Sequence, residues 1–261
     1  MLIKHEYPVL EHDTDTSAVI APTHEGLELK LPKCAVFAFL GDCVDSYAAE
    51  KGLGQLGVFD SETRDYPLYL VKHRGVEVVL CQAPVGAAAA TQILDWLIGY
   101  GVRTVISAGA CGALGDLGEN ELLIPTRALR DEGTSYKYLP PSRFAEVNSD
   151  AVDAIEKAVA HRGLKAKKVT TWSTDGFYRE TKAMVAYRKA EGCEAVEMEC
   201  SALAACAEMR NAAWGCLLYT ADTLFVPDAY DERDWGNASR RIALEICLDA
   251  VVELQKRNTE E

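Results

Sequence analysis

Short apolar runs of strand length alternate along this chain with Ala-rich or amphipathic segments of helical length. Cys34–Leu40 (CAVFAFL) lies between Pro32 and Gly41 and predicts a buried strand. Gly86–Gly101 is Ala-rich, has apolar residues at helical spacing and predicts a helix. Alternating strands and helices indicate an α/β fold with a central mixed, mostly parallel sheet flanked by helices.

The same patterns predict the remaining elements. Strands are expected at Tyr69–Val71, Val76–Ala83, Val102–Gly109, Glu121–Pro125, Lys168–Trp172, Ala195–Met198 and Gly215–Ala221. Helices are expected at Asp150–Gly163, Ser201–Met209 and Ala238–Lys256, the first with Ser149 or Asp150 as its N-cap. Gly109–Gly112 is expected to form a glycine-rich turn after its strand.

Length and composition favour a single domain. No Pro/Gly/Ser-rich stretch divides the 261 residues, so we expect an α/β domain over 31–261 and an N-terminal extension over 1–30 packed on it. The net charge of −13 disfavours nucleic acid and membranes as partners. Nine cysteines without a CxxC pair indicate reduced core cysteines rather than a metal site, and the N-terminus lacks the apolar core of a signal peptide. A cytoplasmic location is therefore expected.

Several predicted strands end in polar or glycine-rich segments. These are 41–45 (GDCVD), 109–112 (GACG), 173–178 (STDGFY) and 221–223 (ADT), with 196–199 (VEME) at a junction of strand and helix. One acidic strand end is commonly only a helix N-cap. Because ligands of such folds bind at the carboxyl ends of strands, several together predict a ligand site there.

Three of these segments resemble motifs of the nucleoside phosphorylase family, which includes purine nucleoside and uridine phosphorylases. Gly109–Ala113 (GACGA), Val196–Glu199 (VEME) and Thr220–Asp222 (TAD) follow one another at the family's spacing, and Arg130–Tyr136 (RDEGTSY) is similar to a strand-end segment of some members. The resemblance implies cleavage of the N-glycosidic bond of a nucleoside by a homo-oligomer, from dimer to hexamer. It implies no cofactor, with inorganic phosphate as a possible co-substrate.

The resemblance also implies roles for single residues. Glu199 matches the glutamate that accepts hydrogen bonds from the ribose hydroxyls, and Met198 the methionine that lies against the ribose. Asp222 matches the acid that serves N7 of a purine, and Phe177 the aromatic that stacks on the base. Glycosidic cleavage needs such groups, since positive charge develops on the sugar and negative charge on the leaving base. The alternatives are a first-turn glutamate, an N-cap aspartate and an ordinary core phenylalanine.

A purine is favoured over uracil. Uridine-specific members generally lack an aspartate at the position of Asp222. The Gln and Arg with which they bind uracil are not evident after Phe177, where the chain reads Tyr-Arg-Glu-Thr-Lys.

The phosphate site departs from the family pattern. Gly41 matches the family's glycine, Gly109 and Ala110 lie in the motif that contacts the acceptor, and Arg64 matches an arginine lent by a neighbouring subunit. However, Asp45, Ser107 and Ala110 stand where phosphorolytic relatives have an arginine, a second arginine and a hydroxyl residue. A phosphate dianion without paired cations binds poorly.

Three functions therefore remain open. Phosphorolysis follows from the family, with Arg127, Arg130, Lys137 or Arg179 as replacement cations. Hydrolysis follows from the altered site, with Asp45 or, as second choice, Asp42 as the base that activates water. A catalytically silent nucleoside-binding protein is the third, but it would not need an acid such as Asp222 directed at the leaving group.

Overall fold

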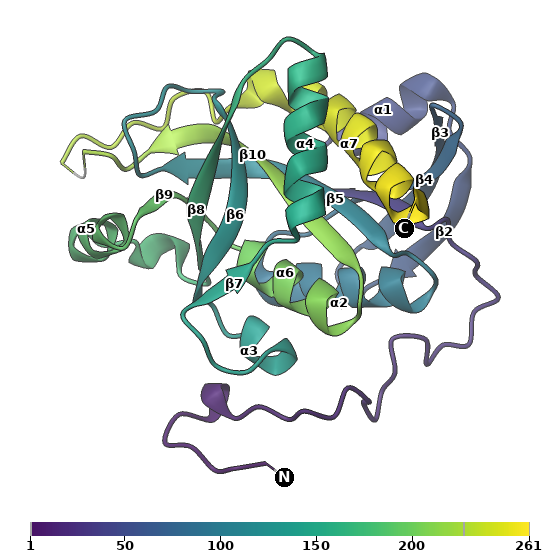
Figure 1. The fold of residues 1–261 in the computed structure, drawn as a ribbon, viewed down its shortest axis with the longest axis horizontal. Coiled ribbons are helices and arrows are strands. Elements are labelled where there is room, and N and C mark those ends of the chain that lie inside the picture. The colour runs from purple at the N-terminus through teal and green to yellow at the C-terminus, as the bar shows by residue number, and fades with distance from the viewer. Residues whose placement is uncertain (1, 227, 261) are drawn as a thin grey trace.

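The computed structural model describes residues 2–226 and 228–260, and a twisted β-sheet lies at its centre (Figure 1). Its strands are β1 (Cys34–Ala38), β2 (Gln55–Asp60), β3 (Asp65–His73), β4 (Val76–Gln82), β5 (Thr104–Ala113), β6 (Leu122–Asp131), β7 (Phe144–Glu146), β8 (Ala166–Thr174), β9 (Cys193–Glu197) and β10 (Ala213–Thr223). Its helices are α1 (Cys43–Lys51), α2 (Ala87–Gly99), α3 (Ser135–Tyr138), α4 (Ser149–His161), α5 (Lys182–Ala190), α6 (Cys200–Met209) and α7 (Arg240–Glu260).

The strand order brings distant segments to one place. It runs β10-β6-β8-β9-β5-β1-β4-β3-β2, and β10 also pairs with β5, so that β5, β10, β6, β8 and β9 close into a ring. The short strand β7 pairs with β6. β1 lies between the parallel strands β4 and β5, whereas β2, β3 and β4 are joined by antiparallel pairings. The predicted fold class, a mixed α/β sheet with flanking helices, is confirmed.

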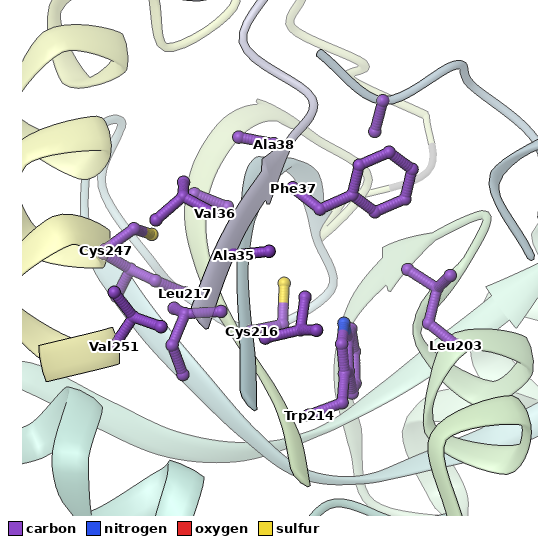
Figure 2. Close-up of a cluster of buried hydrophobic side chains, with 14 of the residues drawn as sticks. Ala35, Val36, Phe37, Ala38, Leu203, Trp214, Cys216, Leu217, Cys247 and Val251 are labelled. Carbon is purple, nitrogen blue, oxygen red and sulfur yellow. The ribbon is translucent and has the colours of Figure 1, made fainter. Parts of the chain in front are cut away.

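Helices cover β1 on both faces, which explains its continuous apolar sequence. Val36 points with Leu217 towards Cys247 and Val251 of α7, while Phe37 points to the side of Trp214 and Leu203 (Figure 2). All five residues of β1 are buried. Because successive side chains of a strand point to opposite faces, a strand buried on both faces contains no polar alternation.

Two local expectations were wrong. Gly109–Gly112 is not a turn: it lies inside β5, since Gly109, Ala110 and Cys111 pair with Leu218, Tyr219 and Thr220 of β10. The N-cap of α4 is Asn148 rather than Ser149 or Asp150, because the Asn148 side chain accepts a hydrogen bond from the backbone N of Ala151 at 2.9 Å.

Residues 2–30, the N-terminal arm, lie outside the sheet and run over the surface below α3 in Figure 1. Trp96 of α2 donates to Glu25 at 2.7 Å, and Arg210 donates to the carbonyl of Thr16 at 2.9 Å. In the described part of the chain, no helix is long and apolar enough to cross a membrane.

Candidate active site

A cavity of about 190 Å³ lies where the carboxyl-terminal ends of β5, β9 and β10 meet. Five residues proposed from the sequence line it together: Ala110, Phe177, Met198, Glu199 and Asp222. The other lining residues are Phe39, Val85, Cys111, Gly112, Glu180, Val196, Glu197, Ala221 and Trp235. Side chains more than a hundred positions apart in the sequence thus share one small chamber.

Glu197 and Glu199 have different tasks, although only one residue separates them. The Glu197 carboxylate accepts hydrogen bonds from the backbone N of Glu199 and of Cys200, at 2.7 and 2.6 Å, and from Ser173 Oγ at 2.6 Å. It therefore satisfies the first amides of α6. The side chain of Glu199 makes no capping bond to this helix.

Glu199 lies in the cavity wall and is only 8% exposed. Its Oε1 accepts a hydrogen bond from the backbone N of Gly86 at 2.5 Å, which fixes the carboxyl beside the start of α2. Burial, followed by the negative charge of Glu197, raises the pKa of Glu199 to about 8. In its ionised form, this carboxyl can accept hydrogen bonds from sugar hydroxyls and oppose positive charge on a sugar.

Asp222 lies near the end of β10 and is 6% exposed. Because it belongs to the strand, it is not an N-cap. Burial raises the pKa of Asp222 above its usual 3.8, against a hydrogen bond from Tyr230 and the positive charge of Arg233. The proton is thus retained at higher pH than on an exposed aspartate, which suits a group that donates to a leaving base.

Gly112 keeps the space beside Asp222 open. A Cβ at this position would lie 2.8 Å from Leu224, 2.9 Å from Val196 and 3.3 Å from Asp222 Oδ1. The glycine of the motif is therefore needed for close packing of β5 against β9 and β10.

Sequence reasoning missed Glu180 and Trp235. Glu180 directly follows the short 3-10 turn Phe177–Arg179, and Trp235 lies on the long connection from β10 to α7. Neither position belongs to a periodic pattern. The only available signal was a tryptophan among acidic residues in the loop before the last helix.

The residues proposed to activate water or bind phosphate lie elsewhere. Asp45, in the first turn of α1, accepts a hydrogen bond from the Tyr69 hydroxyl at 3.0 Å and lies 4.0 Å from Arg64 Nη2 of its own chain. Asp42 is 3.9 Å from Arg240. None of Gly41, Asp42, Asp45 and Arg64 lines the cavity, whereas Gly109 borders a small adjoining hollow with Ala110 and Glu199.

Cations are missing from the cavity wall. Among the residues that the structure describes there, none is Lys or Arg, whereas Glu180, Glu197, Glu199 and Asp222 are all acidic. Arg130 donates to Ser135, Leu139, Pro140 and Ser142, and Lys137 lines a separate hollow of about 790 Å³ under the N-terminal arm. Ser107 accepts a hydrogen bond from Trp214 Nε1 at 3.0 Å and belongs to the core.

Comparison with known proteins assigns the family. A family model described as the phosphorylase superfamily matches residues 35–253. The chain belongs to the phosphorylase superfamily. The family prediction made from the three motifs is thereby confirmed, and the match covers the whole sheet except Cys34, the first residue of β1.

Three similar proteins share between 16% and 25% sequence identity with this chain. It is 25% identical over 203 residues to a guanosine phosphorylase of Halorubrum lacusprofundi, a match that covers 74% of this chain and 83% of the relative. It superposes with a TM-score of 0.75 and 16% identity on a purine nucleoside phosphorylase of Toxoplasma gondii, covering 87% of this chain and 93% of the other. An AMP nucleosidase of Bacteroides thetaiotaomicron superposes with a TM-score of 0.71 and 21% identity, covering 88% and 91%. The phosphorylase superfamily fold thus accommodates proteins named for both phosphorolysis and hydrolysis.

Proposed function

We propose that this protein is an enzyme that cleaves the N-glycosidic bond of purine nucleosides. The observation that carries the proposal is the placement of Glu199 and Asp222, two buried acids, in the wall of one cavity with Phe177. Glu199 would accept the ribose hydroxyls and stabilise the cationic sugar. Asp222 would donate its proton to N7 of the departing base, while Phe177 would stack on its ring.

We infer that water is the acceptor of the sugar. No described Lys or Arg lines the cavity, so a phosphate ion would lack a paired cation there and would be repelled by every wall acid that is ionised. At about 4 Å and an effective dielectric constant near 20, each pair of like charges costs roughly 4 kcal/mol. Water is neutral and therefore is not repelled by the acids.

Phosphorolysis is the second candidate. It is supported by the similarity to the guanosine phosphorylase of Halorubrum lacusprofundi. It is also supported by a cation near Gly41, since Arg240 Nη1 lies 3.0 Å from the point where a Cβ on Gly41 would be. In that case Gly41, Arg64, Gly109 and Ala110 would contact phosphate after a rearrangement of the first strand end. A silent nucleoside-binding protein has less support, because binding does not need the acid at Asp222.

Product identity separates these functions. Purine nucleosides would be incubated with the full chain across a phosphate titration, and ribose and ribose 1-phosphate would be quantified separately. We expect ribose at a rate that does not depend on phosphate. Ribose 1-phosphate as the sole product, with saturation in phosphate, would establish phosphorolysis instead, and no product from any nucleoside would leave only the binding function.

The proposed role of Asp45 as general base has its own test. Its bonds to Tyr69 and Arg64 hold it outside the cavity, so Asp45→Asn is expected to retain hydrolysis within about threefold of wild type. A loss of a hundredfold or more, with an unchanged melting temperature, would show that Asp45 does reach the water.

A further inference from the structure

Glu180 is an acid of the cavity wall to which the proposed mechanism gives no task. It is partly buried beside Phe177 and lines the same chamber as Asp222, although 42 positions separate the two acids. In the described part of the chain, its carboxyl makes no hydrogen bond and no ion pair. A carboxyl that is withdrawn from water without a partner is costly to keep ionised.

The charge of Asp222 acts on Glu180. Burial, followed by the charge of Asp222, raises the pKa of Glu180 to about 7. The pKa of Asp222 is itself raised by burial. Two neighbouring carboxyls in a partly buried site bind their first proton readily, because ionising both at once would place like charges together.

We propose that Glu180 and Asp222 hold one proton between them at neutral pH, and that the pair thereby keeps a proton available for Asp222 to donate to the leaving base. Glu180 is in this view a positioning residue for the proton, acting through Asp222. The inference rests on the proposed glycosidic cleavage and adds to it a residue that no family motif supplied.

Other groups around the pair act in both directions. On the connection after β10, Tyr230 and Arg233 favour the ionised form of Asp222, while Glu232 acts on Tyr230. From β5 and β9, Cys111 and Glu197 face the same chamber, and Glu199 lies at the start of α6. The acids in this set outnumber the single cation, Arg233, so the surroundings favour retention of the shared proton.

Water returns to the acid pair the proton that the leaving base takes away. The O–H bond of the acid pair breaks as N7 of the purine gains the proton, and the electrons of the glycosidic bond move to the base. Water oxygen then bonds to C1′ of the sugar and releases a proton, which restores the pair. No oxidant or further reactant is needed.

The test is the pH dependence of kcat/KM for base release. Glu180→Gln keeps the size of the side chain and removes one of the two carboxyls, so that Asp222 must hold the proton alone. The alkaline limb of the pH profile should therefore move to lower pH by about one unit or more. This shift corresponds to about a tenfold loss of kcat/KM at alkaline pH, with little change near pH 5.5. Glu232→Gln, which removes a nearby charge that does not line the cavity, is the matched control and should leave the limb in place.

The outcomes distinguish failure of this inference from failure of the proposed function. An unshifted alkaline limb in Glu180→Gln, or an equal loss at all pH values, overturns the shared proton. If Asp222→Asn is inactive in the same assay, the cleavage mechanism still stands. If Asp222→Asn is fully active, the proposed function has failed first. Glu180→Asp, which restores the charge, should return the limb towards wild type, and circular dichroism would verify that each variant is folded.

Discussion

At the scale of single residues, environment rather than residue type decides what each acid of this protein does. The Glu197 carboxylate accepts hydrogen bonds from two backbone amides at the start of α6 and from two hydroxyls of β8. These bonds connect α6 to β8. Glu199 receives one backbone amide and faces the cavity. The Val-Glu-Met-Glu motif thus combines one supporting and one reactive carboxyl.

The first prediction concerns the two proposed reactive acids. Glu199→Gln and Asp222→Asn should each lower kcat/KM for the best purine nucleoside by at least about a hundredfold, because one stabilises the sugar cation and the other the leaving base. Steady-state base release measures this, with thermal melting to show that the variants fold. Wild-type rates in both variants would exclude this cavity as the site of cleavage.

The second prediction concerns Gly112. In Gly112→Ala the new methyl would lie 2.8 and 2.9 Å from the side chains of Leu224 and Val196, which must shift, and would crowd Asp222 Oδ1 at 3.3 Å. We expect a loss of stability of about 1–3 kcal/mol and a larger loss of activity. Gly54→Ala, where a Cβ meets no atom within 4 Å, is the control. Equal activity of the two variants would contradict a tight fit beside Asp222.

At the scale of elements, the sequence predicts what local pattern determines. β1 is an uninterrupted apolar run because α7 and α6 cover its two faces, and it was predicted. β2 and β7 were missed, since β2 is mostly half-exposed and β7 has only three residues. The predicted turn at Gly109 extends as strand because β10 supplies partners from more than a hundred positions away.

Some residues of the candidate site could likewise be predicted from the sequence, whereas others could not. Glu199, Met198 and Asp222 belong to short motifs that can be recognised in the sequence, and the structure brings them together. Glu180 and Trp235 enter the cavity from a turn and a loop whose positions depend on the tertiary structure. Local pattern does not encode such contacts.

The third prediction concerns the junction of α7 with β3 and α4. Asp249 of α7 is only 2% exposed and accepts hydrogen bonds from His73 of β3 at 2.7 Å and from Arg162, beyond α4, at 2.8 Å. Asp249→Asn should lower the free energy of unfolding at pH 7 by about 2 kcal/mol. Glu253→Gln, which removes a 3.0 Å pair with Lys256 at the surface and a 3.9 Å contact with Arg74, should cost much less.

The pH dependence of this junction follows from its pKa. Burial would raise the pKa of Asp249, but the hydrogen bonds from His73 and Arg162 outweigh it and lower the pKa below 3.8. Because the folded pKa is the lower one, the stabilisation is complete above about pH 5 and is lost as the pH falls through the folded pKa. Urea unfolding should therefore show the gap between wild type and Asp249→Asn narrowing below pH 4. A constant gap would contradict an ionised Asp249.

At the scale of the whole molecule, the N-terminal arm leaves apolar side chains in water. Val19 is fully exposed and Ile20 is 70% exposed, and Leu2, Ile3 and Tyr7 are exposed as well. Val19 and Ile20 are adjacent in the sequence, and apolar side chains exposed side by side can take part in a protein interface. The arm is therefore a candidate surface for contact with a second copy of the chain.

The fourth prediction is that the protein is a homo-oligomer in which this arm takes part. Val19→Asp combined with Ile20→Asp should shift the mass measured by light scattering towards a smaller species, because two charges would have to be buried without partners. Thr14→Asp, which adds one charge to an exposed position of the same arm, should leave the mass unchanged. The double substitution does not alter the arm's hydrogen bonds through Thr16 and Glu25, so the chain should remain folded. A monomeric wild type would show that the exposed arm contacts no other copy. So would an oligomer whose mass is unchanged by the double substitution.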